Sequence, residues 1–149
     1  MICFEEIRVI TVVYLAVFFP LIIYFKNKDK LPNWVPTFYI VGVVVCSLGW
    51  ELWFSYGWIS GDGVDLRRSE SLNTWLPKDI NWLMNSMGDA GTVLLGGTWL
   101  MWVIHKKDQI VFKEWKWSGF CVLLTWCVTQ NILVEMFLYH DQLAEDKLL

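Results

Sequence analysis

Four long apolar segments alternate with shorter polar segments along this chain. They lie at about residues 7–25, 38–58, 82–105 and 118–138. Each is long enough to cross the hydrocarbon core of a bilayer, which takes about 20 residues of α-helix. Each is also apolar on nearly every side, whereas a helix on the surface of a soluble bundle keeps a polar face. The pattern predicts an all-α, polytopic integral membrane protein, a four-transmembrane-helix bundle forming a single membrane domain over residues 1–149.

The prolines refine the expected helix boundaries. Pro20 lies inside the first apolar segment, where we expect a kink that a membrane helix can tolerate. The longest polar connection, about residues 59–81, is expected to lie outside the membrane. Because proline is well suited to the first turn of a helix, the third helix could begin as early as Pro77.

The composition agrees with a membrane protein and narrows its chemistry. Hydrophobic residues make up 56% of the chain and charged residues 18%, and the 11 tryptophans suit membrane interfaces. The four cysteines form no C-x-x-C pair and the two histidines lie at helix ends, so we expect no disulfide framework and no metal site. Basic residues are too scattered for a nucleic-acid surface. The sequence identifies no cofactor and carries no known catalytic motif.

The distribution of basic residues favours one orientation in the membrane. Four spans place both termini and the middle connection on one side, which carries five Lys and Arg residues. The other two connections carry seven. Since cytoplasmic loops are enriched in Lys and Arg, the second side is expected to be cytoplasmic. Both termini are therefore expected on the non-cytoplasmic side.

Three acidic residues lie within the apolar segments, where an ionisable side chain is costly and indicates a functional site. These are Glu51, Asp89 and Glu135. All three fall in the half of the membrane that faces the middle connection, with Glu51 the deepest at roughly 10 Å from its helix end. Taken singly, Asp89 and Glu135 could also act near a helix end or reach the headgroups. Their shared depth favours a common site.

Neighbouring polar residues extend these positions into stripes, because residues spaced by four share one helix face. The stripes are Ser47, Glu51 and Ser55 on the second helix, Asn85 and Asp89 on the third, and Asn131 and Glu135 on the fourth. Lipid penalises such stripes, so we expect them to face one another inside the bundle. Arg67 and Arg68 of the middle connection are the candidate counter-charges for the carboxylates.

Small residues recur in the second and third apolar segments and are interpreted as packing positions. They are Gly42, Cys46, Gly49, Gly88, Gly91, Gly96 and Gly97. Small residues let the backbones of neighbouring membrane helices approach closely. We expect them to contribute to helix packing rather than to chemistry.

Three functions are compatible with these patterns. The first is a polar, acidic pocket in one leaflet that binds a lipid-like or cationic ligand, and possible enzymatic activity would use Glu51 as the catalytic carboxylate. Asp89, Glu135, Asn131, Asn85, Arg67 and Arg68 would then bind the ligand. The second is an accessory or scaffold subunit whose partners are membrane lipid and other membrane subunits or further copies of the chain. The third is an ion or proton pathway, although the half of the bundle on the basic side offers few polar residues.

Overall fold

The computed structural model of the 149-residue chain describes residues 2–57, 61–134 and 136. All regular elements among these residues are helical, which confirms the predicted all-α class for this part of the chain. The longer helices are α1 (Phe4–Asn27), α2 (Val35–Leu48), α3 (Trp50–Tyr56), α6 (Lys78–Ala90), α7 (Gly97–Ile104) and α8 (Trp117–Val134). The shorter elements are η1 (Lys28–Lys30), α4 (Val64–Arg67), α5 (Glu70–Trp75), η2 (Gly91–Gly96) and η3 (Gln109–Phe112).

Three helical stretches in the described residues are long and apolar enough to cross a membrane, and a fourth qualifies if a bent pair counts as one span. The three are residues Phe4–Lys30, Lys78–Ile104 and Trp117–Val134. The bent pair is α2 and α3, whose axes differ by 42°. The last residues of the predicted fourth helix lie outside the described residues.

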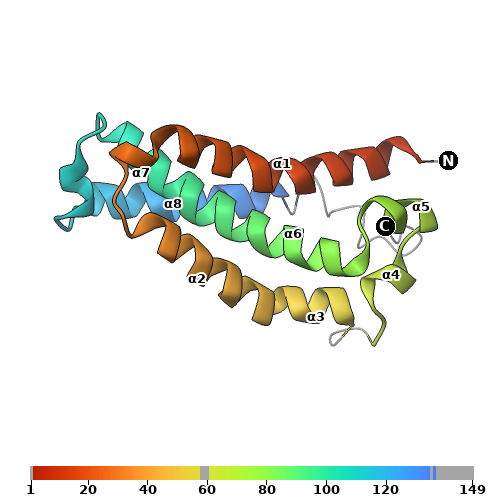
Figure 1. The fold of residues 1–149 in the computed structure, drawn as a ribbon. Helices are drawn as coiled ribbons and strands as arrows, with labels where there is room; N and C mark the ends of the chain where they lie inside the picture. The colour runs from red at the N-terminus through yellow and green to blue at the C-terminus, as the bar shows by residue number, and fades with distance from the viewer. Residues whose placement is uncertain (1, 58–60, 135, 137–149) are drawn as a thin grey trace.

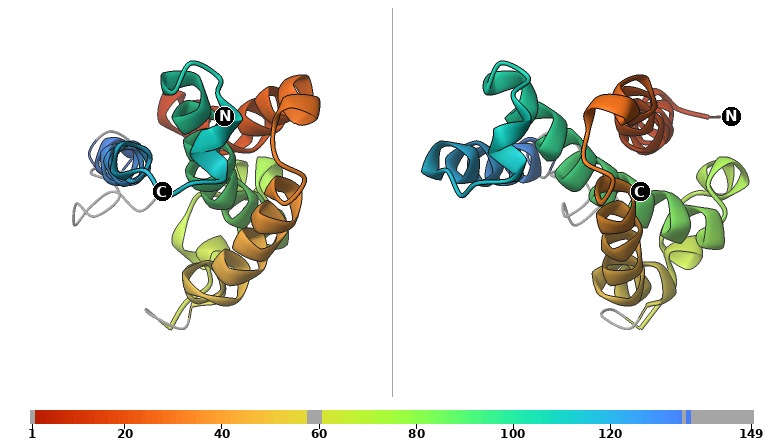
Figure 2. Two further views of the ribbon diagram at one scale, coloured as in Figure 1. Left: turned by 90° about the vertical axis from the view of Figure 1, so that its left-hand side faces the viewer. Right: turned by 60° about the vertical axis from the view of Figure 1, so that its left-hand side comes forward.

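The stretch α6–η2–α7 forms the centre of the molecule. α1 packs along α6 and η2, α2 and α3 pack on α6 from another side, and α8 packs against α7 (Figure 1). The views in Figure 2 show α8 on the opposite side of this central stretch from α2. α1 and α2 therefore contact the central stretch far more than they contact each other.

Glycines on the central stretch allow these close approaches. A Cβ at Gly88 would lie 3.2 Å from the Ala16 Cβ of α1, and one at Gly91 would lie 3.4 Å from the Ala16 carbonyl oxygen. A Cβ at Gly97 would lie 3.2 Å from Leu123 of α8. The predicted packing role of Gly88, Gly91 and Gly97 is thus confirmed, because any larger residue would push α1 or α8 away.

The second apolar segment differs from the single helix that we predicted. It breaks at Gly49, whose φ of −85° and ψ of −123° are not helical. A Cβ there would lie 2.7 Å from the Val45 carbonyl oxygen, so the break requires glycine. The break frees the Ser47 carbonyl, and the Trp82 indole N–H of α6 donates to it at 2.8 Å. An indole thus replaces a helical hydrogen bond at this point.

The third segment is continuous but not uniformly α-helical. Its middle, η2, is a π-helix of six residues. The Trp126 indole N–H of α8 donates to the Thr92 carbonyl inside this π-helix at 2.7 Å. π-helical turns often occur at functional sites, and here the turn provides an attachment point for α8.

The middle connection is largely helical and packs on the bundle. Leu72 and Leu76 are almost fully buried in one cluster with Val9 and Val13 of α1. A second cluster, at the other end of the molecule, joins Leu31, Val35, Leu95 and Trp102. Figure 1 shows α4 and α5 at the same end as the N-terminus. Residues 59–81 are therefore, where described, a folded cover on one end of the bundle.

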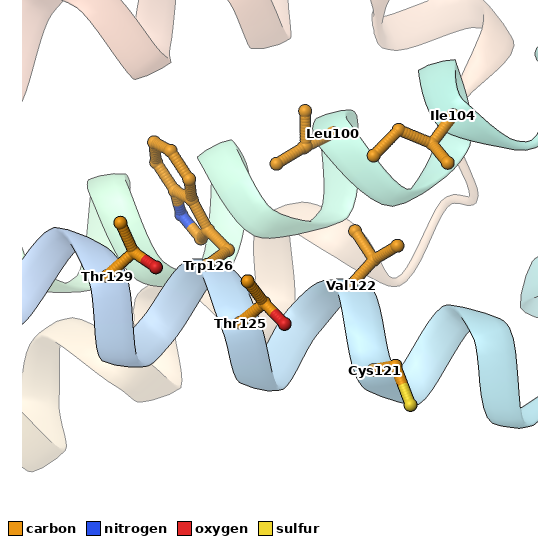
Figure 3. Close-up of a pocket in the computed structure, with 7 residues that line it drawn as sticks. All are labelled: Leu100, Ile104, Cys121, Val122, Thr125, Trp126 and Thr129. Carbon is orange, nitrogen blue, oxygen red and sulfur yellow. The ribbon is translucent and has the colours of Figure 1, made fainter.

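α8 is the most peripheral of the long helices. Gly119 is its only buried residue in the range Trp117–Val134. A groove of about 360 Å³ runs between α7 and α8, with an almost wholly apolar lining (Figure 3). It is lined by Leu100, Ile104, Cys121, Val122, Thr125, Trp126 and Thr129.

Candidate functional site

The break at Gly49 places Glu51 in the first turn of α3, directed into the protein. Its side chain is only 7% exposed, and its Oε2 atom has no hydrogen-bond donor among the described residues. Burial of a carboxylate without a full set of partners is costly. Glu51 is therefore the deepest unsatisfied acidic group of the described structure.

Ser55 lies one turn further along α3, on the same face. It is fully buried, and its hydroxyl also has no partner among the described residues. Ser47, the third member of the predicted stripe, is buried too, but its hydroxyl donates to the Val44 carbonyl at 3.0 Å. Glu51 and Ser55 thus provide two buried oxygen atoms with unused hydrogen-bonding capacity.

α6 contributes an amide and a second carboxylate to this region. The Asn85 side chain is within interaction range of the Glu51 carboxylate, and the Asp89 carboxylate is close enough to repel it. Asp89 accepts a hydrogen bond of 2.8 Å from the Trp50 indole. α3 and α6 together bring Glu51, Asn85 and Asp89 into one cluster, in agreement with the predicted facing of their stripes.

The broken helix adds to the negative potential of this cluster. The last carbonyls of α2 point toward the break, and the C-terminal end of a helix carries a partial negative charge. Cys46, near that end, is buried and lies within electrostatic range of both Glu51 and Asp89. Two carboxylates and a helix C-terminus therefore converge, an arrangement that favours a positive charge.

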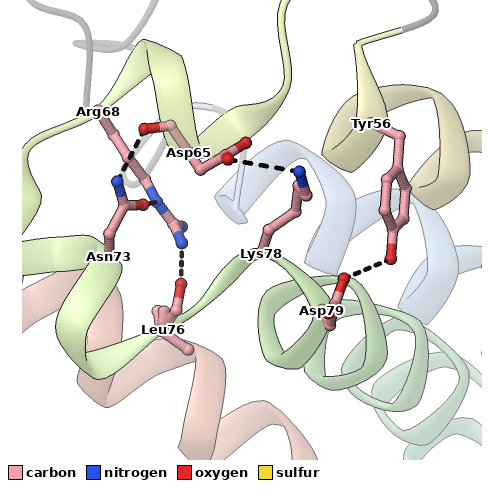
Figure 4. Close-up of polar contacts among 7 residues, drawn as sticks. All are labelled: Tyr56, Asp65, Arg68, Asn73, Leu76, Lys78 and Asp79. Atoms are coloured by element: carbon pink, nitrogen blue, oxygen red, sulfur yellow. Dashed lines mark hydrogen bonds and ion pairs between the residues drawn. The ribbon is translucent and has the colours of Figure 1, made fainter.

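The two predicted counter-charges bind backbone carbonyls and side-chain amides instead. Arg67 donates to the Phe54 carbonyl in the last turn of α3. Arg68 donates from Nε to Asn73 at 2.6 Å and from Nη2 to the Leu76 carbonyl (Figure 4). Its Nη1 atom donates to Asn81 at 3.0 Å. Burial lowers the pKa of the Arg68 guanidinium from its ordinary value, because desolvation disfavours the charged form.

Further polar contacts connect this end of the bundle. Lys78 and Asp65 form an ion pair of 3.3 Å, and the Tyr56 hydroxyl donates to Asp79 at 2.7 Å (Figure 4). These contacts fasten α4 and the end of α3 to the start of α6. They form a polar layer between the Glu51 cluster and the middle connection.

One predicted site residue, Asn131, is not brought into the cluster, and another cannot be placed. The Asn131 side chain is exposed, and its amide donates to the Cys127 carbonyl of its own helix at 2.8 Å. Glu135 lies outside the described residues. The cluster in the described structure consists of residues from α2, α3 and α6.

Sequence reasoning missed several side chains that organise the structure. Trp50 and Trp82 act as hydrogen-bond donors, and neither role has a local sequence signal. Glu6, only 4% exposed, accepts from the Ser71 hydroxyl at 2.7 Å, from Ser69 and from the Cys3 backbone N–H at 2.8 Å. The spacing of Cys3 and Glu6 is that of a capping box and could have predicted the last of these bonds.

Neither the cavities nor the arrangement of possible metal ligands adds residues to the Glu51 cluster. Neither of the two best-formed cavities includes a predicted site residue; one is the groove beside α8 and the other lies at the opposite end from the middle connection. Among the described residues, no group of three His, Cys, Asp or Glu side chains is arranged to hold a metal ion.

Comparison with known proteins found no relative for this chain. No family model matches the sequence, and neither a curated protein nor a solved structure matches it significantly.

Proposed function

We propose that this chain is a small integral membrane protein whose Glu51 cluster binds a cationic ligand, or the cationic group of a lipid-like molecule, within one leaflet. Glu51 supplies the binding carboxylate, with Asp89 and Asn85 beside it. If the bound ligand is also transformed, Glu51 is the group placed to act as acid or base. The observation that carries the proposal is the buried Glu51 Oε2 atom, which has no donor in the part of the chain that the structure describes.

The surroundings of Glu51 support a cation rather than an anion. Asp89 and the C-terminal end of α2 add negative potential, while Arg67 and Arg68 are already engaged with carbonyls. The buried Ser55 hydroxyl offers a second oxygen ligand one turn away. A positive group would satisfy these atoms and relieve the repulsion between the carboxylates.

The proposal includes a membrane orientation. The candidate spans supply the length and apolar character that membrane insertion needs. The seven lysines on two connections favour a cytoplasmic location for that side, so the proposal assigns both termini and the Glu51 half of the bundle to the non-cytoplasmic side. Cysteine accessibility labelling at Asp29→Cys and Glu70→Cys, on a background without native cysteines, would test this orientation.

The direct test is native mass spectrometry of the protein extracted gently from its own membrane. Wild type should carry a defined extra mass, and Glu51→Gln should lose it, because the neutral amide cannot pair with a cation. The isosteric change keeps the volume of the side chain, so circular dichroism should show an unchanged fold.

A matched control is Asp62→Asn, which removes an exposed carboxylate of the middle connection. It should retain the extra mass. Wild type without any bound mass, or Glu51→Gln with the same mass as wild type, would overturn the proposal.

A second candidate function, an accessory subunit of a membrane complex, rests on α8. Only 6% of its apolar window is buried inside the structure, and Asn131 is exposed on it. Polar amides within membrane helices commonly bond to a neighbouring helix. Foreign subunits that co-purify with wild type and are lost with Asn131→Leu, but not with Glu51→Gln, would favour this function.

A further inference from the structure

A cavity at the end of the bundle opposite the middle connection has a different chemical character from the Glu51 cluster. Its volume is about 370 Å³, and it lies between the two short connections that contain η1 and η3. It is lined by Asp29, Leu31, Pro32, Asn33, Trp34, Gln109, Phe112 and Lys113. The lining thus combines one acid, one base, two amides and two aromatic rings.

The position of this cavity matches the headgroup layer of a membrane. η1 directly follows the last residue of α1, and η3 lies between the end of α7 and the start of α8. If the candidate spans cross the bilayer, these connections emerge at its surface. Trp34 is 46% exposed, as is typical of tryptophans at this depth.

The two charged residues of the cavity are available to a ligand. Asp29 and Lys113 line the same space, yet they form no ion pair in the described structure, whose single ion pair is Lys78–Asp65. Both side chains are exposed. Opposite charges that share a cavity without pairing are suited to a ligand that itself carries both charges.

The aromatic rings favour the positive part of such a ligand. Trp34 and Phe112 meet edge to face, with ring centroids 6.1 Å apart and planes at 82°. An ammonium group is attracted to the face of an indole or phenyl ring. Lys113, with the side-chain amides of Asn33 and Gln109, supplies the donors that a phosphate needs.

The walls of the cavity are held in place by contacts between the connections. The Gln109 amide donates to the Lys30 carbonyl at 3.0 Å and so joins the two connections. Asp108 accepts from the Ile110 N–H at 2.9 Å and caps η3. Leu31 and Val35 are buried in the second core cluster, which fixes the segment between η1 and α2.

From these observations we propose that the cavity binds the headgroup of a zwitterionic phospholipid, with the ammonium between Asp29 and the aromatic rings and the phosphate at Lys113. This site is separate from the Glu51 cluster and rests only on the proposed membrane location. It explains why an acid lies among the lysines of this end, since a site for a purely anionic headgroup would gain nothing from Asp29.

The test is native mass spectrometry of the delipidated protein in detergent, titrated with dihexanoyl phospholipids. Phosphatidylethanolamine or phosphatidylcholine should bind at least about 5-fold more tightly than phosphatidylglycerol, because only the former two carry the ammonium. Asp29→Asn should weaken zwitterionic lipids about 10-fold and leave phosphatidylglycerol unchanged. Lys113→Gln should weaken all three lipids.

Two controls separate this site from other effects. Lys116→Gln changes a nearby lysine that does not line the cavity and should bind like wild type. Glu51→Gln should also bind like wild type, so failure of the Glu51 proposal leaves this result intact. Equal binding of all three lipids, no effect of Asp29→Asn, or equally tight binding of free phosphoethanolamine would overturn the assignment to a zwitterionic lipid.

Discussion

The central stretch α6–η2–α7 and the peripheral helix α8 have similar apolar character but very different surroundings. Half of the residues in the apolar window of Lys78–Ile104 are buried inside the structure, against 6% in Trp117–Val134. The central stretch contacts α1, α2, α3 and α8, whereas α8 packs on α7. Hydropathy therefore identifies both as candidate spans but does not distinguish a central helix from a peripheral one.

The distribution of glycine explains the difference. The central stretch carries Gly88, Gly91, Gly96 and Gly97, and α8 carries only Gly119. In a membrane, lipid is as apolar as a neighbouring helix, so close packing rather than hydrophobicity decides which helices associate. A helix with several glycines can receive neighbours on several sides, and one without them keeps lipid around it.

The largest effect should come from filling a glycine of the central stretch. Gly88→Leu would insert a side chain where the Ala16 Cβ of α1 is already 3.2 Å from an added Cβ. Overpacking of this kind should destabilise the protein by about 3 kcal/mol, measured as a loss of thermal stability in detergent.

The matched change on α8 is Cys121→Leu, at an exposed position of the groove wall. It should alter stability by less than about 0.5 kcal/mol. Equal losses in both variants would remove the distinction between the central stretch and α8.

An intermediate effect is expected at the helix break. Gly49→Ala places a Cβ 2.7 Å from the Val45 carbonyl oxygen, closer than a Cβ normally approaches a backbone atom. The cost should be about 2 kcal/mol, measured by thermal unfolding. Gly119→Ala on α8 meets the flexible Met101 sulfur at 3.2 Å and should cost clearly less. A stability of Gly49→Ala equal to wild type would show that α2 and α3 can form one straight helix.

The smallest loss of stability is expected when the indole N–H of Trp82 or Trp126, which donates to a carbonyl in an irregular helical segment, is removed. Trp82→Phe removes the indole donor to the Ser47 carbonyl, and Trp126→Phe removes the indole donor to the Thr92 carbonyl. Each should cost about 1 kcal/mol. Hydrogen exchange distinguishes them: Trp82→Phe should increase exchange in α2 and α3, and Trp126→Phe in α8. Increased exchange across the whole molecule in both variants would contradict local roles.

The sequence predicts the helical class well but not the irregularities within the helices. Long apolar segments and Pro77 indicate where helices lie, and α6 begins directly after Pro77. Gly49 was interpreted as a packing residue, whereas it breaks the helix. Glycine in an apolar segment is compatible with both outcomes, and the choice depends on whether a neighbour such as Trp82 can satisfy the freed carbonyl.

The candidate site was predictable only where two helices pack directly. Glu51, Asn85 and Asp89 meet because α3 lies on α6. Asn131 was placed in the same site from its spacing with Glu135 and from the shared depth of the stripes. Depth along a helix does not determine the order of helices around a bundle, and α8 packs on the other side of the central stretch.

The arginines illustrate a further limit. Arg67 and Arg68 were expected to face the carboxylates because they lie in the middle connection, which is on the same side of the bundle as the predicted pocket. The middle connection instead folds into α4 and α5, and the ends of these and neighbouring helices leave carbonyls that the guanidinium groups satisfy. Such carbonyls become visible only once the local structure is known.

The central position of α6–η2–α7 also bears on the order of events during synthesis. α1 and α2 emerge from the ribosome first, but their main packing partner is encoded later, from Lys78 onward. Until that stretch has been made, the first two helices have few contacts with each other to keep them together. Glu6 likewise acquires its serine partners only when residues 69–71 have been translated. The bundle therefore gains most of its contacts between helices only when its third segment is present.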